Sequence, residues 1–390
     1  MLFQIIEDHI YIDGQLRPYE YVEDMSRTWS YNSLLGLKNV ECAQIWAKGK
    51  NLDECCPEDF KNDWTKNKNK IKAFIKSYKH VGMPLNKMNL IEIVPEKFIK
   101  KLLSSKNIIT EHVFSNFDKP RNHDFMYDVF SLIGDISKRT LKLDFEYLKF
   151  MSYKPYVKNL LNRMDKKAPR IVYKPYGTVT GRLSIQSGSF PILNLAREAR
   201  KAILPKNDCF LELDFNSAEL RVFLALNDKE QPENDIHDWN AKNIFKENMT
   251  RDEIKKKTFA WLYNPKAVDK SLEMCYNKKY VLEKYFDGNY INTIFHRKIK
   301  SDDHHALNYI IQSTTSDLFL KQAIKIFKML KGKKTNVAFT IHDSLVLDFH
   351  LSDKGMVERI IEEFSDTSLG KFKVNISGGR NFGEMKEMNL

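Results

Sequence analysis

The 390-residue chain carries 63 Lys and Arg against 51 Asp and Glu, a formal net charge of +12, and 42% of its residues are hydrophobic. A chain of this length and apolar content can bury a sizeable core and fold as one multi-lobed unit or two domains. It contains no run of 18 apolar residues and no basic leader followed by an apolar stretch, so we expect a cytoplasmic protein without a membrane span or secretion signal.

The first 170 residues are predicted to be mostly helical. The opening stretch, Phe3 to Gly14, indicates a short hairpin with Asp13 and Gly14 at its turn. Helices are expected over residues 95–104 and from 124 to about 164, the second broken near Lys154-Pro155 because proline interrupts helical hydrogen bonding.

Residues 71–78 place apolar side chains at helical spacing, with lysines mostly on the other side. Two interpretations stay open for this face and for the basic charge as a whole. Lysines that neutralise phosphates release counterions and favour nucleic-acid binding. Many basic proteins, however, simply have solvated cationic faces.

Residues 171–184 predict a strand, a turn at 175–177 and a second strand. Farther along, the apolar run 209–213 has the pattern of a buried strand that stops at Asp214, and residues 219–226 show helical periodicity. An aspartate in this position can be an ordinary helix cap. A functional role for Asp214 therefore depends on a second acid that lies close to it.

Four side chains recur every four residues in the next predicted helix and share one slightly spiralling face: Arg251, Lys255, Phe259 and Tyr263. The two cations can hold a triphosphate, and the two rings can flank a sugar and a base pair. A basic amphipathic helix can also be purely structural.

Two short runs of apolar β-formers surround His342 and Asp343, so residues 336–349 predict a hairpin. Histidine and aspartate at such a tip can be plain turn residues. If the sheet brings Asp343 next to Asp214, the two carboxylates make a divalent-cation site, because Mg²⁺ prefers carboxylate oxygens and substrate phosphates.

From Tyr173 to the C-terminus the chain resembles family A DNA polymerases, the class of bacterial DNA polymerase I and many phage enzymes. The resemblance is carried by ordered motifs: Thr180–Ser184, Leu193–Leu195, Asp214–Glu219, Asp235–His237, Arg251–Tyr263, Thr293–Arg297, Asn308–Asp317, His342–Asp343 and Lys371–Gly383. It implies an α+β right-hand fold with a thumb, a palm built on an antiparallel sheet, and fingers. Residues 1–170 would hold an N-terminal segment and thumb-like helices, 171–226 and 301–390 the palm, and 227–300 the fingers.

The implied activity is that of a DNA-directed DNA polymerase, with primer-template DNA and deoxynucleoside triphosphates as partners. By resemblance, Asp214 and Asp343 with the Phe215 carbonyl would bind two Mg²⁺ ions, for which Mn²⁺ can substitute. Lys255 is the candidate general acid. The implied nucleotide-binding residues are Glu219, which would exclude a ribose 2′-hydroxyl, with His237, Arg251, Lys255, Phe259 and Tyr263; the implied DNA-binding residues are Arg182, Asn308, Gln312 and His342.

The chain departs from the family pattern at three positions: Asn264 replaces glycine, His304 replaces arginine and Ser344 replaces glutamate. These changes leave open a catalytically silent nucleic-acid-binding relative. A ribonucleotide-polymerising variant is a second alternative, against which Glu219 argues. No Asp-x-Glu signature of a proofreading exonuclease is found near the start, so we expect a compact, monomeric viral or plasmid polymerase without 3′–5′ exonuclease, in the host cytoplasm or nucleoid if viral.

Overall fold

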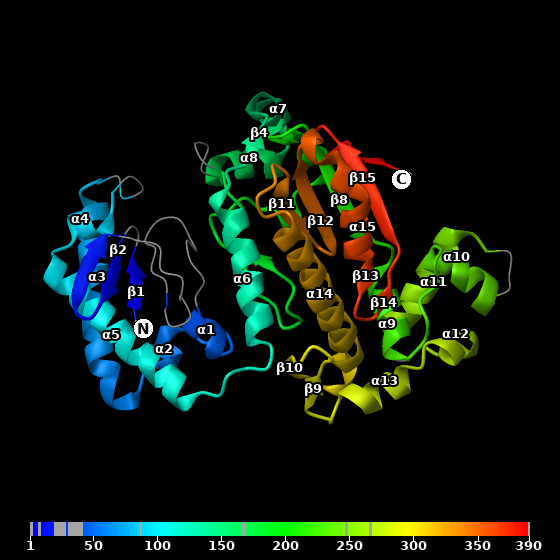
Figure 1. Ribbon diagram of the computed structural model, residues 1–390, viewed down its shortest axis with the longest axis horizontal. Coiled ribbons are helices and arrows are strands. Elements are labelled where there is room, and N and C mark those ends of the chain that lie inside the picture. Colours follow the sequence, from blue (N-terminus) through cyan, green and yellow to red (C-terminus); the bar gives the residue numbers. More distant parts are fainter. Residues whose placement is uncertain are drawn as a thin grey trace. The chain divides into compact units, whose positions relative to one another are not determined.

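The computed structural model describes residues 3–6, 9–18, 29, 42–83, 85, 88–164, 169–245, 249–264 and 267–388. It divides into two compact units, Met1–Lys138 and Arg139–Leu390, which we call the smaller and the larger unit. Each unit is described by itself (Figure 1). The division falls ahead of the boundary at residue 170 that the resemblance implied.

The smaller unit begins with a three-stranded antiparallel sheet of β1 (Phe3–Ile6), β2 (His9–Ile12) and β3 (Gln15–Pro18). The turn between β2 and β3 is Asp13-Gly14, and both residues have positive φ, 48° and 77°. Two positive φ angles are what a type I′ hairpin turn requires. The expected hairpin is therefore present and gains a third strand.

Seven helical segments complete the described part of the smaller unit: α1 (Cys42–Trp46), α2 (Leu52–Cys55), η1 (Glu58–Phe60), α3 (Lys61–His80), α4 (Leu90–Ile93), α5 (Glu96–Asn116) and α6 (His123–Lys138). Helices α3 and α5 pack together, and Trp64 and Ile71 of α3 share a buried core with Leu102, Ile109 and Val113 of α5. Both helices are longer than the sequence predicted.

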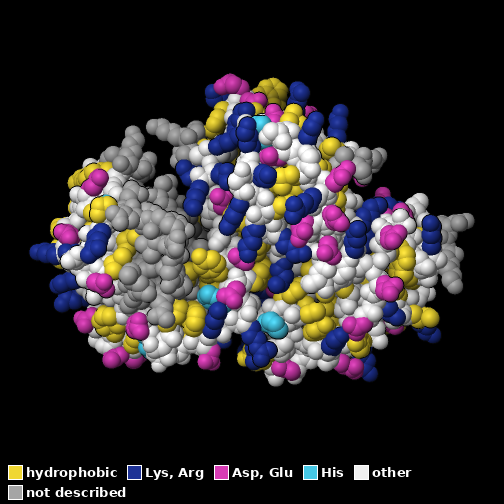
Figure 2. Space-filling view, in the orientation of Figure 1, with side chains coloured by type: hydrophobic (Ala, Val, Ile, Leu, Met, Phe, Trp, Pro, Cys, Tyr) yellow, Lys and Arg dark blue, Asp and Glu magenta, His cyan; other side chains and the backbone are white. Residues whose placement is uncertain are grey.

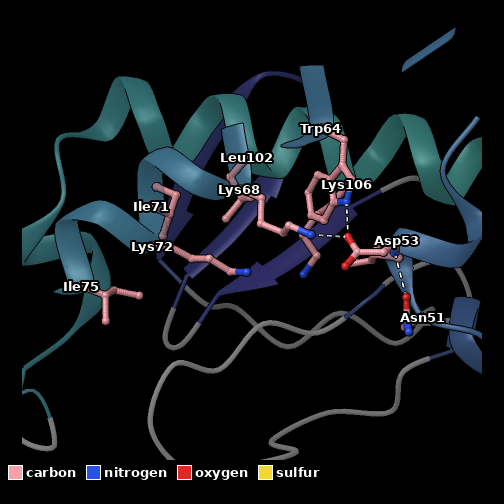
Figure 3. Close-up of a pocket in the computed structure, with 10 residues that line it drawn as sticks. Asn51, Asp53, Trp64, Lys68, Ile71, Lys72, Ile75, Leu102 and Lys106 are labelled. Atoms are coloured by element: carbon pink, nitrogen blue, oxygen red, sulfur yellow. Dashed lines mark hydrogen bonds and ion pairs between the residues drawn. The ribbon is translucent and has the colours of Figure 1, made fainter. Parts of the chain in front are cut away.

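A cavity of about 290 Å³ lies beside α3, with Trp64, Ile71 and Leu102 among its walls and lysines around it (Figure 3). One of these lysines is engaged locally, because Lys68 Nζ lies 2.5 Å from Asp53 Oδ1. The Trp64 indole donates to the same carboxylate at 2.6 Å. Lys68 thus stabilises its own unit, which favours the structural interpretation at this one position of the lysine face.

The segment expected to be helical from 124 to 164 is broken twice. After α6 the chain forms β4 (Lys142–Leu143), which pairs with β7 (Ile203–Leu204), and only then α7 (Phe145–Phe150), η3 (Met151–Tyr153) and α8 (Pro155–Arg163). The break near Lys154-Pro155 is confirmed, since Pro155 starts α8. The break at 139–144 was missed, because it depends on a pairing partner about 60 residues away.

A five-stranded antiparallel sheet forms the centre of the larger unit, in the order β11 (Asn336–Ile341), β12 (Ser344–Phe349), β8 (Cys209–Phe215), β15 (Val374–Gly379) and β16 (Lys386–Glu387). One face of β8 packs on helices: the Phe215 ring stacks 4.5 Å from that of Phe364 in α15 (Val357–Ser365). Helix α14 (Asp303–Met329) packs against α15 and against α9 (Ala218–Leu226), and runs beside the sheet in Figure 1. The opposite face of β8 carries Glu212 and Asp214.

The remaining elements connect or flank this sheet. They are β5 (Tyr173–Lys174), β6 (Ser184–Ile185), η4 (Ile192–Asn194), η5 (Arg197–Ala202), α10 (Ile236–Asn240), the π-helical turn η6 (Ala241–Phe245), α11 (Arg251–Tyr263), α12 (Lys270–Cys275), α13 (Lys278–Tyr285), β9 (Tyr290–Asn292), β10 (Lys298–Lys300), η7 (Leu351–Met356), β13 (Asp366–Thr367) and β14 (Gly370–Lys371). Within the described ranges, no helix has the length and apolarity needed to cross a membrane. Lys and Arg side chains are spread over the face seen in Figure 2, interspersed with Asp and Glu.

Candidate active site

The sheet brings the two predicted aspartates to the same end. Asp214 is the penultimate residue of β8, and it lies directly opposite Ser344, the first residue of β12. Asp343 immediately precedes Ser344 in the two-residue tip that joins β11 to β12. The predicted hairpin is therefore confirmed, and the strand register puts its tip beside Asp214.

Burial acts on both carboxyl groups, and like charges act on Asp214. Burial raises the pKa of Asp214 to about 7, with further contributions from the negative charges of Glu212 and Asp343, while a hydrogen bond from Asn375 and the positive charge of Lys255 oppose the rise. Burial also raises the pKa of Asp343, opposed by Arg182 and His342. The charged groups that act here come from β8, the hairpin tip, helix α11 and the 180–184 loop.

The donor set fits a hard divalent cation. Among the described residues, no three His, Cys, Asp or Glu side chains are placed to hold one ion together. Mg²⁺ does not need such a cage, since it is usually bound by one or two carboxylates, several waters and substrate phosphates. Asp214 and Asp343 supply two carboxylates, and the Phe215 carbonyl is the third protein oxygen that the resemblance implied.

Glu219 lies in the first turn of α9 and forms an ion pair with Arg182. Burial raises the pKa of Glu219, and Arg182 opposes that rise. Arg182 and His342 also line a small cavity of about 60 Å³ together with Thr340. Arg182 thus lies between the predicted sugar-selecting residue and the hairpin tip.

Helix α11 presents the predicted face. Thr250 caps it by accepting a hydrogen bond from the Glu253 amide. The side of the helix that is buried consists of Ile254, Thr258, Trp261 and Leu262. Arg251 and Lys255 are exposed, and the rings of Phe259 and Tyr263 stack 5.9 Å apart. Arg251 forms an ion pair with Asp235 at 2.6 Å, so this cation is engaged within the protein.

His237 is buried beneath this helix. Its Nε2 lies 2.8 Å from Ser217 Oγ, its ring lies 5.9 Å from Phe259, and its Nδ1 has no hydrogen-bond partner. Burial lowers the pKa of His237 to about 4, so the imidazole is neutral at pH 7. A contact with phosphate stays a prediction for this residue, because its exposed fraction is zero.

The predicted DNA-binding residues of α14, Asn308 and Gln312, share one helical face with His304, since the three residues are spaced four apart. His304 and Asn308 line a cavity of about 530 Å³ together with Tyr263 from the end of α11. Asn308 Oδ1 is buried without a hydrogen-bond partner. Buried polar atoms are rarely left unpaired, and such exceptions often mark sites where a ligand or water supplies the partner.

Comparison with curated proteins matches the chain to DNA polymerase I of Borreliella burgdorferi (strain ATCC 35210 / DSM 4680 / CIP 102532 / B31), 23% identical over 290 residues. The match covers 59% of this chain but 32% of that protein, so the chain spans about a third of the relative's length. Among solved structures, the POL domain of Pol1 from M. smegmatis, a complex with DNA primer-template and dNTP, matches 90% of this chain and 68% of that one, with a TM-score of 0.51 and 14% identity.

The fold is that of a DNA polymerase I polymerase domain. The expected right-hand α+β architecture with an antiparallel sheet is thereby confirmed. No protein-family model matches the chain.

Within this polymerase fold, the structure adds a positioning residue that the sequence did not indicate. Arg221 of α9 is fully buried, and its guanidinium donates to the carbonyls of Asn216, Pro232 and Asn234 at 2.9, 2.8 and 2.7 Å. These bonds fix the loop that leads to Asp235 and His237. An arginine within a run of buried helix residues is the only sequence signal that could have revealed it.

A second buried cluster supports the loop that carries Arg182. The Arg297 guanidinium donates to both carboxylate oxygens of Asp317, at 3.0 and 2.6 Å. Gly181, with φ of 78°, lies against this pair: a Cβ at this position would lie 2.5 Å from Arg297 Cζ. The glycine of the Thr-Gly-Arg motif therefore allows both the left-handed backbone and the close approach to Arg297.

Proposed function

We propose that the chain is a DNA-directed DNA polymerase of family A, which adds deoxynucleotides to a primer 3′-hydroxyl by two-metal phosphoryl transfer. The observation that carries the proposal is the pair of half-buried aspartates at one end of an antiparallel sheet, with the positive charge of Lys255 of α11 acting on Asp214. The resemblance to DNA polymerase I in sequence and fold supports it.

Phosphoryl transfer mainly requires positioning and neutralisation of charge. Asp214, Asp343 and the Phe215 carbonyl would hold two Mg²⁺ ions, which would supply activation of the primer hydroxyl and neutralisation of charge on the leaving pyrophosphate. In this proposal Arg251 and Lys255 hold the triphosphate, and Lys255 donates a proton to the pyrophosphate.

Binding of substrate would exchange two internal ion pairs. Arg251 is paired with Asp235, and Arg182 is paired with Glu219. A triphosphate competes with Asp235 for Arg251, and the minor groove near the primer end competes with Glu219 for Arg182. Release of Glu219 then leaves its carboxylate in the space that a ribose 2′-hydroxyl would occupy, which selects deoxynucleotides.

The assignment of subdomains follows from the same proposal. Residues 171–226 and 301–390 make the palm, residues 227–300 the fingers, and residues 1–170 contain the thumb. The duplex minor groove contacts Asn308 and Gln312 of α14, where correct base pairs present similar acceptors and can be checked by shape.

Extension of a labelled primer on a DNA template with Mg²⁺ tests the proposal. We expect the wild type and the control Asp59→Asn to extend the primer with deoxynucleotides, because Asp59 lies exposed in η1, whereas Asp343→Asn should not. Salt-sensitive binding of primer-template without extension by the wild type would instead indicate a catalytically silent relative. Ribonucleotide incorporation at an equal rate would contradict the role of Glu219.

A further inference from the structure

A third acid lies on the same sheet face as Asp214. Side chains alternate along β8, so Leu211, Leu213 and Phe215 are buried on the helix-covered face, while Glu212 and Asp214 are partly exposed on the other. Glu212 forms no ion pair within 4 Å among the described residues. The negative charge of Glu212 acts on Arg200 of η5.

Ser344 turns the Glu212 side chain toward the two aspartates. Its hydroxyl donates to Glu212 Oε1 at 2.5 Å. In the strand register Ser344 lies opposite Asp214, whereas Glu212 lies opposite Val346, so this hydrogen bond runs diagonally across the two strands. The diagonal contact draws the carboxylate toward the end of the sheet where Asp214 and Asp343 lie.

The arrangement also accounts for the serine at position 344. In the motif described above, the residue after Asp343 is a glutamate; here it is a serine, and the acid is supplied by the adjacent strand. Glu212 and Asp343 each act on Asp214 as like charges, so Asp214 lies within electrostatic range of both acids. Three carboxylates held this close repel one another, and a divalent cation relieves that repulsion.

We propose that Glu212, held by Ser344, is the third carboxylate of the divalent-cation site and replaces the acid that is missing at position 344. The inference rests on the proposed polymerase function. Because no three acids among the described residues are placed to bind one ion directly, Glu212 acts on the water ligands of the ion. Mg²⁺ retains several waters, and groups that orient such ligands change metal affinity about 10- to 100-fold.

Binding of Mn²⁺ to the full chain without DNA or nucleotide tests this role, with paramagnetic resonance of free Mn²⁺ as the readout. We assign to the proposed site the part of the Mn²⁺ binding that is lost in the Asp214→Asn variant. At this site we expect Glu212→Gln to raise the Kd for Mn²⁺ about 10- to 100-fold and Ser344→Ala to raise it less. The control Glu358→Gln removes an exposed acid of α15 and should bind like the wild type.

Thermal melting separates this role from a structural one. If Glu212 serves the cation, Glu212→Gln removes a like-charge repulsion, keeps or raises the melting temperature without metal, and shows a smaller rise with Mn²⁺. If Glu212 serves only to pair with Arg200, the variant melts lower without metal and binds Mn²⁺ like the wild type. The second result would overturn the inference.

A swap variant provides a further test. Glu212→Ser combined with Ser344→Glu moves the acid back to the hairpin and should bind Mn²⁺ more tightly than Glu212→Ser alone. If the swap variant does not fold, the single variants still decide whether Glu212 contributes to Mn²⁺ binding. Normal primer extension together with wild-type Mn²⁺ binding by Glu212→Gln overturns the inference and leaves the polymerase proposal intact. A Glu212-dependent Mn²⁺ site in a chain that extends no primer keeps the cation site and overturns the polymerase proposal.

Discussion

Replacing Arg297 with methionine should destabilise the larger unit by about 3–5 kcal/mol. The magnitude follows from the geometry of its pair with Asp317. The Asp317 side chain is fully buried, that of Arg297 is 12% exposed, and the two are joined by two hydrogen bonds. Methionine leaves the Asp317 carboxylate buried and unpaired, which lowers the free energy of unfolding far more than loss of an exposed ion pair does. Lys279→Met, which breaks an exposed pair with Glu283 at 3.7 Å, should change stability by less than about 0.5 kcal/mol.

The double variant Arg297→Met with Asp317→Leu provides the decisive comparison. Removal of both charges restores an uncharged interior of nearly conserved volume, so the double variant should be more stable than Arg297→Met alone. Urea unfolding followed by tryptophan fluorescence gives the free energies, and native-state hydrogen exchange of α14 assigns the transition to the larger unit. Additive losses in the double variant would refute the reasoning, because independent sites add and a buried pair does not.

Three further predictions concern single side chains around the site. Glu219→Ala should raise ribonucleotide incorporation, measured as the ratio of kcat/KM for ribo- and deoxynucleotides; an unchanged ratio would contradict steric selection. Gly181→Ala should cost at least about 1 kcal/mol and slow primer extension, since alanine meets both a positive φ and Arg297; wild-type melting and extension rates would argue against this packing. His237 has its pKa lowered from 6.5 to about 4, so below pH 6.5 the unfolded chain takes up a proton that the folded chain does not. Stability should therefore fall by about 3 kcal/mol between pH 6.5 and pH 4. This fall should be smaller in His237→Gln when urea midpoints are compared across pH.

Much of the candidate site could be predicted because its signals are local. The apolar lead-in to Asp214, the hairpin around Asp343 and the four-residue spacing in α11 each lie within a short stretch of sequence, and all three elements form. The end of β8 shows where such reasoning stops. We expected the strand to end at Asp214, but it includes Phe215, because that residue pairs with Val374 of a strand about 160 residues later.

The features that were missed depend on contacts between distant segments. The buried guanidinium of Arg221 is satisfied by hydrogen bonds to carbonyls of a later loop, and that of Arg297 by hydrogen bonds to a carboxylate on α14. Nothing local in the sequence marks Glu212, because its diagonal contact with Ser344 exists only once the β8 and β12 register is set. Composition and periodicity carry no information on these pairings.

Two residues beside Asp214 and Asp343 have left-handed backbones without being glycine. Ser217, three residues after Asp214, and His342, immediately before Asp343, both have φ of 53°. This conformation costs an L-residue roughly 1–2 kcal/mol. Directed evolution for heat resistance alone should therefore recover glycine at both positions, at the expense of the Ser217 bond to His237 and of the His342 side chain. Variant libraries built to raise the melting temperature of the protein should hold these two positions fixed.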